Sequence, residues 1–193
     1  MGGTHEFSNG NGSMSRYVKE IAERMVFAYP LLYDDDHRIL AEFCRRGSTY
    51  LEVGVYAGGS AIVAGLAGCE VWGIDTWSYP DEMKTPKPTP DDVRANWEAF
   101  GLDPARLHLY QAQHPPLPDE LAGRTFDTAL IDGGHEAEEV WRDWASVSPR
   151  VRGYVLFHDA NRAGPYWAML KVLKEDPRWG RVGLPVGCTT TMR

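Results

Sequence analysis

The stretch Tyr50-Leu51-Glu52-Val53-Gly54-Val55-Tyr56-Ala57-Gly58-Gly59-Ser60-Ala61 decides the fold of this chain. Residues 49–53 form a short apolar, β-branched run that is typical of a buried strand, and Gly54 ends it. From Ser60 to Gly68, small residues followed by glycine predict a helix. The segment is therefore expected to form a strand, a glycine-rich turn and a helix, as at the start of many α/β sheets.

The same alternation continues along the chain. Apolar runs predict further strands at 70–74, 107–111, 128–131 and 154–157, and helical spacing predicts helices at 91–100, 136–147 and 166–174. Short apolar strands separated by helices indicate an α/β, doubly wound, Rossmann-like sheet that is mostly parallel and has helices on both faces. The tail from Arg181 to Met192 is β-branched with Gly and Pro between, which predicts a C-terminal antiparallel hairpin.

The N-terminal part has two sections. Residues 1–13 are rich in Gly, Asn and Ser, lack a core pattern and precede a second Met at position 14, so they look like an expression leader rather than a targeting peptide. Residues 14–193 are then expected to form a single domain. Within it, 14–47 should form two helices separated near Pro30 that lie over the active site.

Composition narrows the class of protein. The chain has 193 residues, 43% of them hydrophobic, which suits one compact domain. A formal charge of −7 disfavours nucleic acid and anionic membranes as partners. The three cysteines form no C-x-x-C pair, and no apolar run is long enough to span a membrane. We therefore expect a cytoplasmic protein that acts on a small molecule, and a homo-oligomer stays open.

The glycine-rich turn has acidic neighbours that narrow its ligand. It lacks the Gly-Lys-Ser/Thr end of a phosphate-binding loop and the third glycine of the dinucleotide pattern. Glu52 stands before the first glycine instead, and Asp75 follows the next strand. A carboxylate at the end of that strand suits the hydroxyl groups of a ribose, and Glu52 suits an ammonium group. Together they predict a ligand with a ribose and a cationic amino acid, but no pyrophosphate.

Three motifs carry a resemblance to a known family. Residues 50–61 resemble motif I of class I S-adenosylmethionine-dependent methyltransferases, in the form found in catechol-type O-methyltransferases. Ile131-Asp132-Gly133-Gly134-His135 and Val155-Leu156-Phe157-His158-Asp159 look like the Ile-Asp-Gly-x-His and Phe-His-Asp motifs of a bacterial branch that includes small-molecule and sugar O-methyltransferases. The resemblance runs over residues 50–173. It implies transfer of a methyl group from S-adenosylmethionine to a hydroxyl of a sugar or specialised metabolite, with S-adenosylhomocysteine as product.

The resemblance also implies where the cofactor binds. Glu52 and Gly54 would lie at its methionine end together with Asp132, and Asp75 would bind the ribose. The other contacts that it implies are Tyr56, Gly58, Ser60, Thr76, Trp77 and Gln113, the last three near the adenine. The turn that contains Gln113 reads Tyr110-Gln111-Ala112-Gln113 and departs from the Gly-Asp or Gly-Ala of many relatives. Trp77 is equally compatible with a packing role.

Acids and histidines gather at the ends of two predicted strands. Asp132 and Asp159 follow the fourth and fifth strands, and His135 and His158 lie in the same loops. Because parallel strands end at one edge of the sheet, these side chains should meet there. Asp132, His158 and Asp159 suit Mg²⁺ or another divalent cation. In catechol-type relatives an Asp-Asn pair binds the metal, whereas this chain reads Asp159-Ala160, so a metal-free site in which Asp132 meets the cofactor is equally open.

Methyl transfer to a hydroxyl requires the loss of one proton. We expect His135 to be the general base, with Asp132 as the second catalytic residue, because an imidazole titrates near neutral pH and the Gly-Gly turn leaves its ring room. The acceptor would lie under the 78–90 loop and the N-terminal helices, where apolar walls or core positions are offered by Tyr29, Tyr33, Tyr79 and Met83.

Other functions stay open at this point. One is a metal-dependent hydroxylase-type relative, in which the metal matters more than the sulfonium. Another is a catalytically silent S-adenosylmethionine-binding module. A nicotinamide dehydrogenase is a more distant alternative, and thermal stabilisation by NAD or by S-adenosylmethionine would separate the two.

Overall fold

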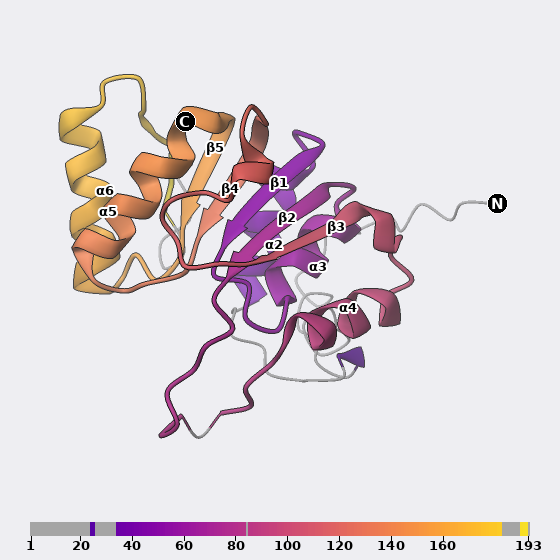
Figure 1. Ribbon diagram of the computed structural model, residues 1–193. Helices are drawn as coiled ribbons and strands as arrows, with labels where there is room; N and C mark the ends of the chain where they lie inside the picture. The colour runs from indigo at the N-terminus through magenta and orange to yellow at the C-terminus, as the bar shows by residue number, and fades with distance from the viewer. Residues whose placement is uncertain (1–23, 26–33, 84, 183–189, 193) are drawn as a thin grey trace.

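The computed structural model describes residues 24–25, 34–83, 85–182 and 190–192. Its centre is a parallel sheet in the order β3-β2-β1-β4-β5 (Figure 1). The strands are β1 Thr49–Val53, β2 Glu70–Asp75, β3 Leu107–Gln111, β4 Phe126–Ile131 and β5 Val151–Phe157. β1 pairs in parallel with β2 on one side and with β4 on the other. The expected α/β fold with a parallel sheet is confirmed.

The sheet continues beyond β5 with two short strands. β7, Thr190–Met192, runs antiparallel to both β5 and β6, Arg181–Val182. The connection between β6 and β7 falls on residues 183–189, which lie outside the described residues. The C-terminal hairpin therefore stays a prediction.

Helices cover both faces of the sheet (Figure 1). α2 (Asp34–Cys44), α3 (Gly59–Leu66) and α4 (Pro90–Ala99) share one core cluster, and α5 (Ala137–Val147) and α6 (Ala163–Glu175) share the other. Short 3-10 turns occur at Pro104–Arg106, Asp119–Leu121 and Ser148–Arg150. None of the helices in the described ranges is long and apolar enough to span a membrane.

Some elements begin earlier than the sequence pattern predicts. β4 begins at Phe126, because Asp127, which looks like a loop residue, accepts hydrogen bonds from the backbone N–H groups of Ser48 and Thr49 at the entrance of β1. α6 begins at Ala163 rather than at 166, because Pro165 lies in its first turn, where a missing N–H costs nothing.

The N-terminal predictions are only partly covered by the structure. The leader (1–13) and most of the first expected helix fall on residues 1–23 and 26–33, outside the described residues. Tyr29 and Tyr33 lie there too. The second expected helix corresponds to α2, whose buried Ile39, Leu40 and Phe43 pack in the same core cluster as α3.

Candidate functional site

A cavity of about 850 Å³ opens at the carboxyl ends of the parallel strands. The loops after β1, β2, β3, β4 and β5 line it, together with Met25 and with His37 of α2. The cavity brings together most of the predicted site residues: Gly54, Tyr56, Ser60, Asp75, Thr76, Gln113, Asp132, His135, His158 and Asp159. The other three predicted residues, Glu52, Gly58 and Trp77, are not among its lining residues.

The three glycines of the turn serve different purposes. Gly54 has φ 90°, and a side chain there would collide with the backbone carbonyl of Asp132, so glycine lets the loops after β1 and β4 touch. Gly58 has φ 85° and packs against Val93 of α4. Gly59 lines the cavity, and a Cβ at this position would meet no protein atom within 4 Å. At Gly59 the absent side chain therefore leaves space for a ligand.

Asp75 shapes this turn as well as lining the cavity. Its Oδ2 accepts hydrogen bonds from the backbone N–H groups of Val55 and Tyr56 at 2.9 and 2.8 Å, and its Oδ1 accepts one from Trp77 at 2.8 Å. These bonds use both lone pairs of Oδ2, whereas Oδ1 keeps one acceptor site. Asp75 is therefore a fixed anion at the cavity wall.

Glu52 lies fully buried beneath the turn. Its Oε1 accepts a hydrogen bond from Ser60, which lines the cavity, and its Oε2 has no hydrogen-bond partner among the described residues. Burial raises the pKa of Glu52 well above its usual value, and the nearby charges of Asp132 and Asp75 raise it further. A buried acid with one unsatisfied oxygen suits a cationic ligand group close by.

Trp77 has a packing role in the structure. Its ring is buried against Val55 and Val93, and its Nε1 donates a hydrogen bond to the backbone oxygen of Tyr56 at 3.0 Å. The indole therefore supports the glycine turn from behind instead of lining the cavity. Of the two roles that the sequence left open for Trp77, the structure favours packing.

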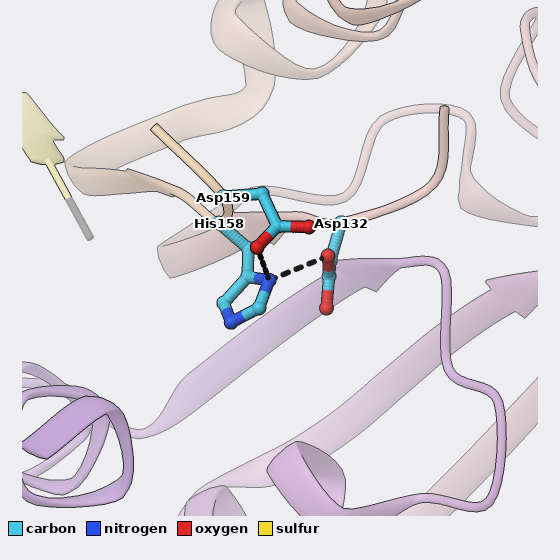
Figure 2. Close-up of side chains that lie close together, drawn as sticks. All are labelled: Asp132, His158 and Asp159. Atoms are coloured by element: carbon cyan, nitrogen blue, oxygen red, sulfur yellow. Dashed lines mark ion pairs between the residues drawn. The ribbon is translucent and has the colours of Figure 1, made fainter. Parts of the chain in front are cut away.

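Asp132, His158 and Asp159 cluster at the ends of β4 and β5 (Figure 2). Nδ1 of His158 lies 2.9 Å from Oδ1 of Asp132 and 3.6 Å from Oδ1 of Asp159, although neither contact has the alignment of a hydrogen bond. One ligand atom from each of the three lies within 4.8 Å of the other two. Two carboxylates and an imidazole at this separation fit a divalent cation.

The carboxylates around His158 favour a positive charge on its imidazole ring. Burial by itself would lower the pKa of His158, but the carboxylates of Asp132, Asp36 and Asp159 outweigh it and raise that pKa to about 10. Burial raises the pKa of Asp132, which His158 partly offsets. In the metal-free protein the imidazolium of His158 thus neutralises part of the acidic cluster, as a bound cation would.

His135 lies at the exposed side of the cluster. Its Nε2 is 2.8 Å from Oδ2 of Asp159, and Nε of Arg162 lies 3.0 Å from the same oxygen. Asp159 therefore faces His158 with one oxygen and His135 with the other. A carboxylate on one ring nitrogen of His135 fixes the orientation of the imidazole and leaves the second nitrogen for another partner.

The structure adds cavity residues to which the sequence analysis assigned no role. His37 lines the cavity from α2, and burial lowers its pKa to about 4. Arg162 lines the cavity next to Asp159, and His114 and Asp143 line it from the β3 loop and α5. No local motif marks His37, because only the packing of α2 on the sheet brings it there. The run Asp159-x-x-Arg162 was a signal that could have indicated Arg162.

Comparison with protein families identifies the class. Residues 51–160 match the family model described as "Methyltransferase domain", and the chain belongs to this family. The match runs from within β1 to just past β5 and includes most of the residues that line the cavity. A comparison with curated proteins found no match.

Solved structures of other proteins share this fold. An O-methyltransferase from Bacillus cereus in complex with SAH superposes with a TM-score of 0.69 at 14% identity, covering 96% of this chain and 92% of that chain. The O-methyltransferase NovP gives 0.63 at 16% identity, with coverages of 93% and 98%. An rRNA methylase from Streptococcus thermophilus gives 0.52 at 13% identity, with coverages of 81% and 90%. At these identities the likeness shows the shared fold alone.

Proposed function

We propose that the protein transfers a methyl group from S-adenosylmethionine to a hydroxyl group of a small molecule, releasing S-adenosylhomocysteine. The observation that carries this proposal is the cavity itself, which is lined both by the glycine turn with Asp75 and by Asp132, His135 and Asp159. The glycine turn and Asp75 suit a ribose and a methionine group, and the acids and histidine after β4 and β5 suit a hydroxyl that must lose a proton.

The proposed cofactor pose uses the fixed features of the turn. The open space at Gly59 admits the ligand to the backbone, and Oδ1 of Asp75 accepts a hydrogen bond from a ribose hydroxyl. Glu52 and Asp132 offer carboxyl groups to the methionine end. A cationic ammonium group close by would favour their ionised forms, against the raised pKa that burial gives both. Thr76 and Gln113 line the cavity on the side assigned to the adenine.

His135 is the proposed general base. With Nε2 directed at Asp159, its Nδ1 is the nitrogen that takes the proton from the acceptor hydroxyl. The imidazolium that forms is stabilised by the same carboxylate, as in other histidine–aspartate pairs. The methyl group then passes in line from the sulfonium to the oxygen.

The Asp132–His158–Asp159 cluster would hold a divalent cation, with one ligand atom from each residue. When bound, such a cation lowers the pKa of a hydroxyl that coordinates it. Binding would require His158 to give up its proton, because a histidine ligand is neutral.

The proposed acceptor is a sugar or specialised metabolite. Tyr56, Tyr79 and Met83 line the cavity and offer apolar contact area for such a scaffold. Neither nucleic acid nor a membrane is proposed as a partner, given the formal charge of −7. We place the protein in the cytoplasm and leave a homo-oligomer open.

The test has two stages that separate the alternatives. Calorimetry should show binding of S-adenosylmethionine and S-adenosylhomocysteine but not NAD. Mass spectrometry should then detect the gain of one methyl group on the oxygen of a compound from a panel of hydroxylated sugars and phenols. Cofactor binding without any product would favour the silent binding module, and a product that requires O₂ would favour the hydroxylase-type relative.

A further inference from the structure

A buried histidine–carboxylate pair joins two walls of the cavity. His114 follows β3 and Asp143 lies on α5, and Nδ1 of His114 is 2.6 Å from Oδ1 of Asp143. The two side chains are only 4% and 6% exposed, although both residues line the cavity. On the other side of the ring, Nε2 lies 3.0 Å from Oγ of Ser146. Every polar position of the imidazole therefore has a partner.

The sequence of contacts Ser146–His114–Asp143 has the connectivity of a nucleophilic triad. A nucleophile must reach its substrate, yet Ser146 is not among the residues that line the cavity. The hydroxyl therefore anchors the ring. These contacts therefore hold the cavity wall in place and do not serve nucleophilic catalysis.

Oδ2 of Asp143 also lies beside the turn that carries the proposed base. A Cβ added at Gly133 would lie 3.4 Å from Oδ2 of Asp143, which is ordinary contact distance. One oxygen of the carboxylate thus holds His114 on the β3 loop, and the other faces the turn from Asp132 to His135. A single side chain of α5 therefore lies between two loops of the cavity.

Stability alone gives little reason for such a pair. Removing two ionisable groups from water costs several kcal/mol, and apolar side chains of similar volume are often as stable or more stable in the same place. What an apolar pair lacks is a fixed direction, because its contacts tolerate sliding and rotation. The polar pair therefore fixes the relative position of the two segments that carry His114 and Asp143.

We propose that His114 and Asp143 are positioning residues for the cofactor, and that they hold the Gln113–Pro115 loop and the Asp132–His135 turn at the separation that receives the adenine base. This inference rests on the proposed function and deepens it. It predicts that the adenosine part of the ligand is the part whose binding depends on the pair.

The decisive variant replaces both partners, His114→Phe with Asp143→Leu, so that no buried charge is left alone and the protein folds. Calorimetry with S-adenosylhomocysteine and with 5′-methylthioadenosine, which lacks the amino-acid group, should give dissociation constants at least roughly tenfold weaker for both ligands. Asp143→Asn keeps an oxygen acceptor for Nδ1 and should stay within about twofold of the wild type. Circular dichroism and thermal unfolding check that each variant is folded.

His108, on the strand β3 that precedes the His114 loop, provides a matched control. Its Nε2 lies 2.8 Å from Oε1 of Glu70, its ring stacks on Trp72, and it does not line the cavity. His108→Phe should leave both dissociation constants unchanged. A folded double variant at 114 and 143 that binds both ligands like the wild type overturns the positioning role. A wild-type protein that binds neither ligand overturns the proposed function instead.

Discussion

Asp75 combines two tasks in one carboxylate. It accepts hydrogen bonds from three backbone N–H groups, which fixes the glycine turn, and it faces the cavity where we place the ribose. The sequence indicated the second task from the position of Asp75 after β2. The sequence did not indicate the first task, because two of the three donors, Val55 and Tyr56, come from the backbone of another segment.

The first prediction separates these tasks. Asp75→Ala should weaken S-adenosylhomocysteine binding by about 1.5–3 kcal/mol, since hydrogen bonds to a charged acceptor are lost. It should also lower the melting temperature, because three backbone N–H groups lose their acceptor. Calorimetry and thermal unfolding measure the two effects. Unchanged affinity in a folded variant would remove Asp75 from the cofactor site.

The second prediction concerns His135. Removing a positioned general base lowers turnover by about two to four orders of magnitude, so His135→Ala should do so while cofactor affinity stays near that of the wild type. His135→Gln should not restore turnover, because an amide cannot take the proton. Steady-state kinetics on an acceptor found in the panel would measure this. Wild-type turnover in His135→Ala would move the role of base to another residue, with His158 the next candidate.

The third prediction follows from the raised pKa of Glu52. A carboxyl group whose pKa is raised by folding contributes stability below its unfolded pKa of about 4.3, and this contribution is lost as the pH rises through the folded pKa. Glu52→Gln should therefore unfold at higher urea concentration than the wild type at alkaline pH, with the difference shrinking towards about pH 4. If Glu52 faces the cofactor ammonium group, the same variant should bind S-adenosylmethionine more weakly. A difference in urea midpoint that grows on acidification would contradict this.

At the scale of elements, the glycine turn between β1 and α3 offers a paired test. In Gly54→Ala the new methyl group would meet the backbone of Asp132 at a positive φ, so the free energy of unfolding should fall by at least about 1 kcal/mol. In Gly59→Ala the methyl group meets no protein atom, and alanine favours the first turn of α3, so stability should hold or rise. Cofactor affinity should fall in both.

Urea unfolding and calorimetry on the two glycine variants give four values to compare. The informative one is the affinity of Gly59→Ala, because that variant is expected to fold normally. If it binds S-adenosylhomocysteine as tightly as the wild type, the space beside Gly59 does not belong to the cofactor.

The elements also show how far the sequence predicts this protein. Regular hydrophobic spacing predicted the five parallel strands and the helices between them, because those patterns are local. It missed the starts of β4, β5 and α6. Asp127, Gly153 and Pro165 lie there, and residues of these types are more typical of loops than of strands or helices. For the site, the positions of Asp132, His135 and Asp159 after two parallel strands predicted that these residues lie close together, and they do. The contributions of His37, His114 and Asp143 depend on packing between distant segments, which no local pattern encodes.

At the scale of the whole molecule, the fifth prediction concerns the cluster shared by β4 and β5. If Asp132, His158 and Asp159 hold a divalent cation, excess chelator should abolish turnover and Mg²⁺ should restore it. Calorimetry with Mg²⁺ alone provides a readout that does not depend on turnover, and Asp132→Asn should abolish that binding. Full turnover in excess chelator would leave His158 as the permanent positive charge of the cluster.

The central place of β1 in the sheet has a consequence for how the protein folds during synthesis. Tyr50 of β1 faces Val71 of β2 on one side and Thr128 of β4 on the other, and Asp159 follows β5, one strand further out. During synthesis the glycine turn and Asp75 leave the ribosome long before Asp132 and Asp159 do. The edge where both substrates meet is therefore completed only when the last parallel strand has docked. A nucleotide-like ligand cannot guide the early steps of folding, and it can only hold together a protein that has already formed.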